Sequence, residues 1–183
     1  MGDLSHPPSA PGLRFELGSI EEFDEPVDLI FSNAAFHWVP DHAALLARLR
    51  CEQLAVQMPM NDDHPSHVTA HELARTHEFR RLLGGFEKRP ALPGPAQYAA
   101  WLHQLGYVRQ HVRLQVYGHL LPGREDVIEW VRSTLLTDYQ KRLSAPDWER
   151  FLERYRALLL PQLSAERPFF YTYPRLLMWG SKK

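Results

Sequence analysis

Three histidines and a glutamate stand close together in the sequence, at His64, His67, His71 and Glu72. On a helix, His67 and His71 would share one face, because residues four apart are neighbours, and paired histidines at this spacing can bind a metal ion. The glutamate adjoins the second histidine instead of lying inside the pair, unlike the common zinc-hydrolase helix. The pattern is more typical of a polar helix start, and we expect no metal site here.

Arg175 stands in the segment YTYPR, with Tyr171 and Tyr173 shortly before it. A planar guanidinium matches a carboxylate through two parallel hydrogen bonds, and tyrosine hydroxyls can donate hydrogen bonds to the same acid. A site built from these residues would bind a ligand that carries carboxylates. The alternative is a solvated arginine on an edge strand, beside tyrosines that only pack.

A third group of residues follows the short apolar run at 27–32. It comprises Asn33, Ala34, Ala35, His37 and Trp38. Open α/β sheets bind ligands at the carboxyl ends of their strands, and small residues at that point allow a ligand to approach closely. A lone histidine beside a tryptophan is commonly only a packed residue, so the residue types alone leave both readings open.

The first part of the chain predicts a strand–helix–strand unit. Residues 13–17 alternate between apolar and polar side chains, as in a half-buried strand, and residues 27–32 form a run typical of a strand covered on both faces. Asp41 is a suitable N-cap for a following helix, and the apolar run at 54–58 predicts another strand. This order favours an α/β fold with a parallel pair of strands.

The rest of the chain is mainly helical. The pattern predicts helices over residues 67–83, 96–105, 125–136 and 144–160, and strands over 108–117 and 169–179. Gly118 and His119 interrupt the alternation of the first of these strands, which should end near Tyr117. Pro174 lies inside the last strand and indicates an edge or a bulge there, since proline cannot donate a backbone hydrogen bond.

Composition excludes several classes of protein. The 183 residues suffice for one domain with a hydrophobic core, and a formal net charge of −1 lacks the basic excess of a nucleic-acid-binding protein. Cys51 is the only cysteine, so no disulfide can form within the chain, and it is expected to pack as a small apolar residue. We find no signal-peptide pattern and no bilayer-spanning apolar window, so we expect a cytoplasmic protein without a membrane partner.

Three stretches together carry a resemblance to a known family. They are VDLIFSNAAFHWVPDHAALLARL at 27–49, LAVQMPMNDDHPSH at 54–67 and FFYTYPRLLMWG at 169–180. They resemble class I S-adenosylmethionine-dependent methyltransferases of the trans-aconitate 2-methyltransferase family, and SNAAFHW followed by QMP is the most specific part. The fold so implied is α/β, a partial doubly wound, Rossmann-like sheet with a C-terminal helical cap. Residues 1–62 would be a remnant of the cofactor-binding sheet and residues 63–183 the cap and closing strands of one domain.

The resemblance also implies a reaction and a set of site residues. The cofactor would be S-adenosylmethionine, and its methyl group would pass to a carboxylate of trans-aconitate or a similar small polyacid, forming a monomethyl ester. The implied catalytic residues are His37 and Trp38, and the implied substrate-binding residues are Tyr171, Tyr173 and Arg175. The implied cofactor-binding residues are Gly18, Ser19, Ile20, Asn33, Ala34 and Ala35, of which the first three would border the adenine.

The chain departs from the family pattern near its beginning. The glycine-rich turn that lets the backbone approach the cofactor is not found, since only Gly2 and Gly12 stand in that region. The acidic residue expected to bind the ribose hydroxyls is not found either. The family's first two strands would lie between the strands predicted at 13–17 and 27–32, so an exposed sheet edge and self-association through it are expected. The main alternative function is therefore a non-catalytic fragment that binds small acids or a partner, and a metal-dependent hydrolase is a distant third.

Overall fold

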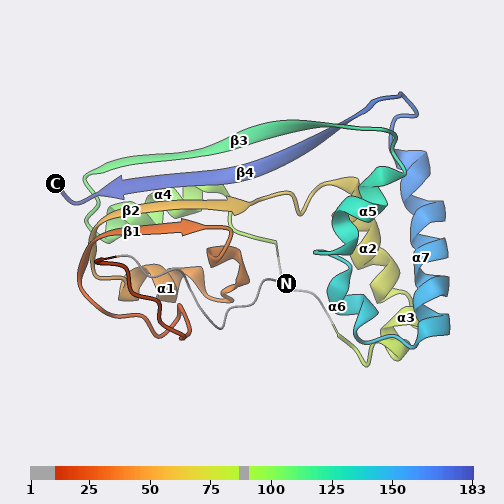
Figure 1. Cartoon of the computed structure of the whole chain (residues 1–183), viewed down its shortest axis with the longest axis horizontal. Coiled ribbons are helices and arrows are strands. Elements are labelled where there is room, and N and C mark those ends of the chain that lie inside the picture. The colour runs from red at the N-terminus through yellow and green to blue at the C-terminus, as the bar shows by residue number, and fades with distance from the viewer. Residues whose placement is uncertain (1–10, 87–90) are drawn as a thin grey trace.

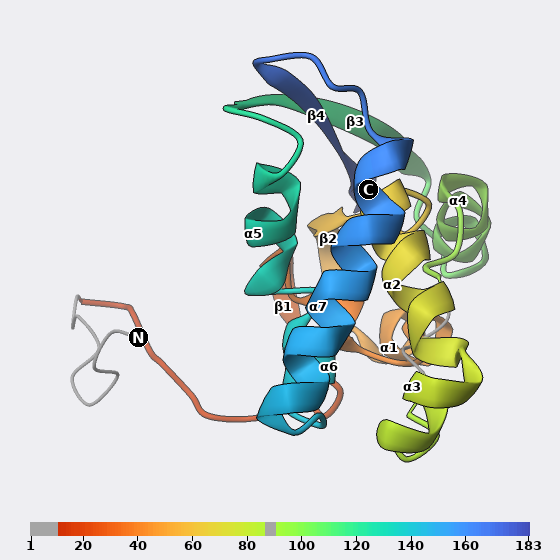
Figure 2. The same ribbon diagram turned by 90° about the vertical axis from the view of Figure 1, so that its right-hand side faces the viewer.

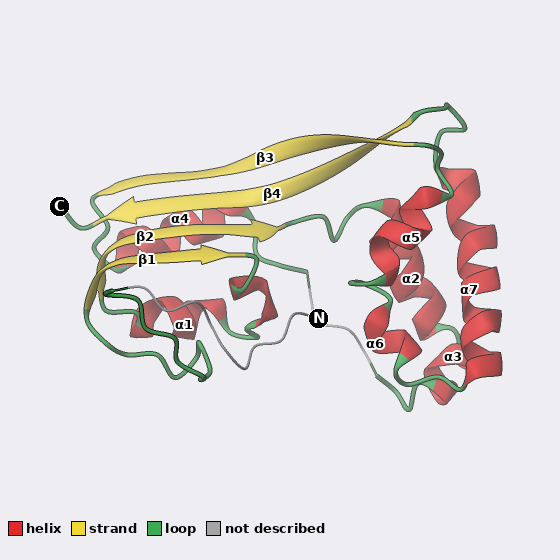
Figure 3. Ribbon diagram, in the orientation of Figure 1, coloured by secondary structure: helices red, strands yellow, loops and turns green. Residues whose placement is uncertain are grey.

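The computed structural model describes residues 11–86 and 91–183. A four-stranded sheet lies at one end, a group of helices lies at the other, and a long two-stranded ribbon joins them (Figures 1 and 3). This is the α/β arrangement with a helical cap that the sequence predicts. None of the helices in these two ranges is long and apolar enough to cross a membrane.

The sheet begins with the predicted parallel pair. Strands β1 (Val27–Asn33) and β2 (Cys51–Pro59) are connected by the short 3-10 helix η1 (Phe36–Trp38) and by α1 (His42–Arg48). The carboxylate of Asp41 accepts a hydrogen bond from the Ala44 N–H at 2.9 Å, which confirms Asp41 as the N-cap of α1.

The other two strands are antiparallel and complete the order β1-β2-β4-β3. Strand β3 spans Arg109–Leu121 and β4 spans Phe169–Ser181. The last strand of the chain thus lies between β2 and β3. It pairs with β3 along its whole length, but with β2 only from Arg175 to Ser181, so its first half extends beyond the sheet as the ribbon.

Two expectations about these strands have different outcomes. The prediction that β3 ends near Tyr117 is wrong, because the strand continues to Leu121. Gly118 permits this continuation, since a Cβ atom there would lie 2.3 Å from the Phe170 ring. The edge near Pro174 is confirmed, because beyond this residue towards Phe169 β4 pairs with β3 alone; the Pro174 carbonyl still accepts from the Met60 N–H at 3.0 Å.

One face of the sheet is covered by α1 and by α4 (Pro95–Gln104). Its core includes Leu54 and Met58 of β2, Leu176 and Met178 of β4, Leu45 and Leu46 of α1, and Tyr98 and Leu102 of α4. The two helices are also joined by a buried hydrogen bond of 2.6 Å between the Tyr98 hydroxyl and His42 Nδ1. Burial of these side chains is what holds the helices to this face.

The helical group has a separate core. Its elements are α2 (Pro65–Arg75), α3 (His77–Leu82), α5 (Asp126–Arg132), α6 (Thr137–Gln140), α7 (Ala145–Leu159) and η2 (Leu160–Gln162). Helix α7 lies against α2 (Figure 2). In this core the centroid of the Phe151 ring lies 5.0 Å from that of Phe79 and 5.3 Å from that of Tyr139. Ser144 accepts from the Asp147 N–H, which confirms the predicted start of α7.

Three predicted elements differ from the structure. The helix predicted at 67–83 is divided at Thr76, whose ψ of 152° is extended and whose hydroxyl donates to the Leu73 carbonyl at 2.8 Å. The helix predicted at 125–136 ends at Arg132. The prediction of a strand at 13–17 is wrong, because the apolar side chains of this segment are exposed and no described strand pairs with it. A strand requires a hydrogen-bonded neighbour, which alternation of side chains alone does not supply.

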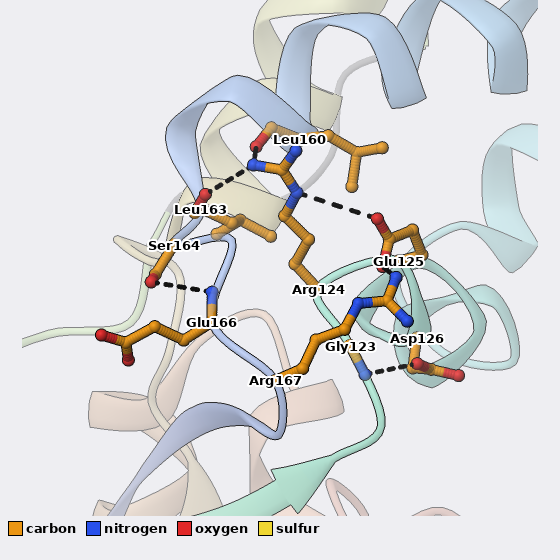
Figure 4. Close-up of polar contacts among 9 residues, drawn as sticks. All are labelled: Gly123, Arg124, Glu125, Asp126, Leu160, Leu163, Ser164, Glu166 and Arg167. Carbon is orange, nitrogen blue, oxygen red and sulfur yellow. Dashed lines mark hydrogen bonds and ion pairs between the residues drawn. The ribbon is translucent and has the colours of Figure 1, made fainter.

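Arg124 ties the end of β3 to the end of α7 (Figure 4). Its Nη1 atom donates to the carbonyl oxygens of Leu160 and Leu163, each at 3.0 Å, at the two ends of η2, which directly follows α7. Nearby, the exposed Arg167 forms an ion pair of 2.9 Å with Glu125. The cap is therefore anchored to the ribbon by one partly buried arginine and one exposed ion pair.

Replacing Arg124 by alanine is expected to lower the free energy of unfolding by about 1.5–3 kcal/mol, because charge-assisted hydrogen bonds to two carbonyl groups are lost. The matched control is Arg167→Ala, which removes only an exposed ion pair and should cost less than about 1 kcal/mol. Urea unfolding of both variants measures the difference. Equal losses would contradict the anchoring role of Arg124.

Candidate active site

The face of the sheet opposite α1 and α4 carries no helix of the described ranges. It contains a shallow depression lined by Phe31, Asn33, Ala55, Gln57, His111, Arg113, Leu177 and Trp179. The strand register arranges these side chains in two rows, one running from Phe31 to His111 and one from Asn33 to Arg113. Phe31 is 73% exposed, although parallel strands are usually covered on both faces. The depression reaches the carboxyl ends of β1 and β2, where such sheets bind ligands.

The chain turns sharply at the end of β1. Ala34 has φ +52°, in the left-handed region that a side chain disfavours, and its N–H donates to the Gln57 carbonyl at 2.8 Å. This hydrogen bond continues the β1–β2 pairing by one residue. The bend then leads through Ala35 into η1, so the small residues expected near a ligand do lie at the carboxyl end of the strand.

The two residues predicted to be catalytic both lie on η1. Phe36 is buried in the sheet core and anchors this short helix. His37 is half-buried, Trp38 is 55% exposed, and their ring centroids are 4.6 Å apart. An exposed indole beside a histidine at this position can line a bound ligand.

Arg175 lies next to the ends of β1 and β2. Its Nη1 atom donates a hydrogen bond to Gln57 Oε1, and Gln57 is the cross-strand partner of Asn33. Among the ion pairs of the described residues none includes Arg175, so its charge faces an amide oxygen instead of a carboxylate. The structure thus brings together two predicted site residues, Asn33 and Arg175, through Gln57. Sequence reasoning missed Gln57 as a site residue, although it stands in the QMP motif.

Tyr171 and Tyr173 extend this group along β4, with ring centroids 6.2 Å apart. The Arg175 guanidinium lies 5.0 Å from the centre of the Tyr173 ring, a cation–π contact. Burial raises the pKa of both tyrosine hydroxyls, and Arg175 acts in the opposite direction on the pKa of Tyr173. Tyr173 is half-buried, and its protonated hydroxyl can donate a hydrogen bond to an acid, whereas Tyr171 is 0% exposed and packs in the core of the cap.

Two further aromatic residues of this region were not predicted. Trp130 of α5 lies 4.8 Å from His119, 5.6 Å from Tyr171 and 6.2 Å from Tyr173, between ring centroids. His119 is the cross-strand partner of Tyr171. A sequence signal existed for each: His119 interrupts the alternation of β3, and Trp130 lies off the apolar side of its helix.

Gly18, Ser19 and Ile20 lie apart from this group. They line a separate shallow depression formed by residues within 16–25, and Ile20 packs against the sheet core that contains Phe36 and Leu45. This depression includes none of the other predicted cofactor-binding residues.

The histidine cluster serves the start of α2. His64 Nδ1 accepts from the Ser66 N–H at 3.2 Å and as N-cap replaces the usual serine or aspartate, while Ser66 Oγ lies 3.1 Å from His67 Nδ1. Burial lowers the pKa of His64, partly offset by the nearby charge of Asp63. Residues 11–86 and 91–183 contain no group of three or more histidine, cysteine or acidic side chains arranged to hold a metal ion.

Comparison with known proteins gives several similar sequences. The chain is 42% identical to the trans-aconitate 2-methyltransferase of Deinococcus radiodurans, over 94% of this chain and 70% of that protein. It is 35% identical to the protein of the same name from Methylobacterium nodulans (92% and 69%) and 34% identical to that of an Enterobacter species (92% and 68%). No protein-family model matches. The solved structure of YcgJ from Bacillus subtilis is 15% identical, with a TM-score of 0.49 over 93% of this chain and 71% of that one.

The bend at Ala34 yields a stability test. Ala34→Gly should raise the free energy of unfolding by about 0.5–1 kcal/mol, because relief of the left-handed strain outweighs the greater freedom of glycine in the unfolded chain. Ala35, with φ −120°, is the matched control, and Ala35→Gly should lower stability by about 0.5–1 kcal/mol. Urea unfolding measures both changes, and a loss of stability in both variants would contradict the strain at Ala34.

Proposed function

Because the chain belongs to the trans-aconitate 2-methyltransferase family, we propose that it binds a small polycarboxylate at Arg175 and methylates one carboxylate to a monomethyl ester. Trans-aconitate, the acid in the names of the relatives, is the first candidate substrate. The observation that carries this proposal is the position of Arg175. It lies at the carboxyl ends of β1 and β2, bonded to Gln57, beside the protonated Tyr173 and without an ion-pair partner among the described residues.

The chemistry requires little from acid–base groups. A carboxylate is ionised at neutral pH and is already a nucleophile. The site must hold the reacting oxygen in position, exclude water and bind the other carboxylates of the acid. Arg175 suits the last task, because its guanidinium can bind a carboxylate through two parallel hydrogen bonds. Tyr173 would donate to the same acid, with the buried Tyr171 packed behind it at 6.2 Å, and His37 with Trp38 would line the point where cofactor and acid meet.

S-adenosylmethionine supplies a methyl group on a sulfonium centre. Asn33, Ala34 and Ala35 fit the methionine part of this cofactor, because they combine a polar side chain with small residues at the exposed end of β1. Gly18 to Ile20, proposed to border the adenine, lie against a different part of the sheet. The chain spans about 70% of the length of its Deinococcus relative. The described residues thus support the acid side and the methionine side of the proposed site.

Calorimetric titration with S-adenosylhomocysteine, followed by trans-aconitate, tests the proposal. We expect micromolar binding of the first ligand and binding of the acid to the resulting complex. Arg175→Ala should weaken acid binding by about 100-fold, because a charge-assisted pair contributes about 2–3 kcal/mol. The matched control Arg109→Ala changes an exposed arginine at the far end of β3, opposite Ser181 and outside the depression, and should change binding by less than about threefold.

The two halves of the proposal fail separately in this experiment. Absence of heat at millimolar S-adenosylhomocysteine from a folded sample would exclude a cofactor site in this chain. If the Arg175→Ala variant binds the acid with unchanged affinity, Arg175 does not bind the acid. Acid binding without transfer of a labelled methyl group would support the alternative, a small-acid-binding module.

A cytoplasmic location and self-association are also part of this proposal. The edge of β1 has no neighbouring strand among the described residues, and Leu29 and Phe31 are 53% and 73% exposed on the uncovered face. An apolar face beside a free strand edge favours association. Sedimentation velocity is expected to detect dimers or larger species, which Phe31→Lys should reduce. A single monomeric species at all concentrations would contradict this.

A further inference from the structure

Trp130 occupies an unusual place on α5. The neighbouring Val127, Ile128 and Val131 are 0–2% exposed and form the buried side of this helix. Trp130 lies off that side and is 39% exposed, although an indole contributes most to stability when it is buried. The core of the cap therefore does not account for a tryptophan at this position.

The exposed indole is held by aromatic contacts to the ribbon. Its centroid lies within 4.8–6.2 Å of the rings of His119, Tyr171 and Tyr173. Tyr173 in turn carries the Arg175 guanidinium over its ring. A continuous series of contacts thus leads from Trp130 on the cap to the arginine at the sheet.

The strand register places these groups on one face. Tyr171, Tyr173 and Arg175 alternate along β4, so their side chains point to the same side, and His119 lies opposite Tyr171 on β3. This is the side opposite Leu176 and Met178, which face the core under α1 and α4. Trp130 therefore borders, from the cap, the same face on which Arg175 lies.

We infer that Trp130 is a specificity-determining residue of the acid site, with its indole forming the wall that contacts the carbon skeleton of the substrate. This rests on the proposed function, in which Arg175 binds one carboxylate. A flat, conjugated acid can lie against an aromatic wall with its carboxylates pointing outward, whereas a saturated chain is thicker and makes poorer contact with the ring face. The site thus favours planar, unsaturated polycarboxylates. His119 is a positioning residue, because it packs against the indole and acts through it.

The test uses the full chain, in which all five tryptophans are labelled as 5-fluorotryptophan. Fluorine NMR spectra are recorded with S-adenosylhomocysteine, before and after addition of trans-aconitate, and Trp130→Phe assigns the resonance of Trp130. The matched control is Trp101 of α4, which packs against Tyr98 at 5.4 Å on the opposite face of the sheet. We expect the acid to shift the Trp130 resonance and to leave the Trp101 resonance in place.

Binding measurements supply the second readout. Trp130→Ala should weaken trans-aconitate binding about tenfold and binding of its saturated analogue, propane-1,2,3-tricarboxylate, by less than about threefold, since the aromatic contact serves mainly the flat acid. Trp101→Ala should change neither affinity. If Trp130→Ala does not fold, Trp130→Phe should keep the packing and still lose about threefold for trans-aconitate alone.

The outcomes separate this inference from the function on which it rests. Acid binding by the wild type, with an unmoved Trp130 resonance and unchanged selectivity in the variants, would overturn the role of Trp130 and leave the proposed function intact. Failure of the wild type to bind either acid would overturn both. An equal loss of affinity for trans-aconitate and its saturated analogue in Trp130→Ala would overturn the inferred selectivity for flat acids.

Discussion

The pairing of β4 with β3 along its whole length is the interaction on which the rest of the structure depends. Because β4 also pairs with β2 through its second half, this one strand belongs both to the parallel sheet and to the ribbon that reaches the cap. Its alternation directs Leu176 and Met178 into the sheet core and Tyr173 and Arg175 to the opposite face. A slip of one residue would exchange these two sets, so burial of the core holds the candidate site residues in place.

The same pairing joins two hydrophobic cores that share few residues. One core lies between the sheet and the helices α1 and α4, and the other lies among α2, α3, α5, α6 and α7. The ribbon connects them, and Arg124 fastens its far end to the carbonyl groups that close α7. The distance between Arg175 and the aromatic residues of the cap is thereby set by backbone hydrogen bonds, which deform less readily than a flexible linker would.

The chemistry assigned to the site follows from what its residues can and cannot do. A methyl transfer to a carboxylate requires orientation and charge neutralisation more than proton transfer, and the site offers an arginine bonded to an amide, with the protonated Tyr173 beside it. Of the histidines that could have suggested a metal centre, His64 caps α2 and accepts from the Ser66 N–H, while His67 and His71 lie within this helix. Membership of the trans-aconitate 2-methyltransferase family is the basis for proposing an acid as the substrate.

The sequence by itself determined the family, the parallel strands around α1 and the N-caps Asp41 and Ser144, because each is encoded by neighbouring residues. It also proposed Asn33, Tyr171, Tyr173 and Arg175 as site residues, and their roles stay a prediction. Only the tertiary structure decided that residues 13–17 form no strand and that β3 passes through Gly118, because strands depend on partners distant in sequence. It also decided that Gln57 connects Asn33 to Arg175 and that Trp130 borders the same face. Those contacts follow from strand register and from packing between α5 and the ribbon, which local patterns of side chains do not specify.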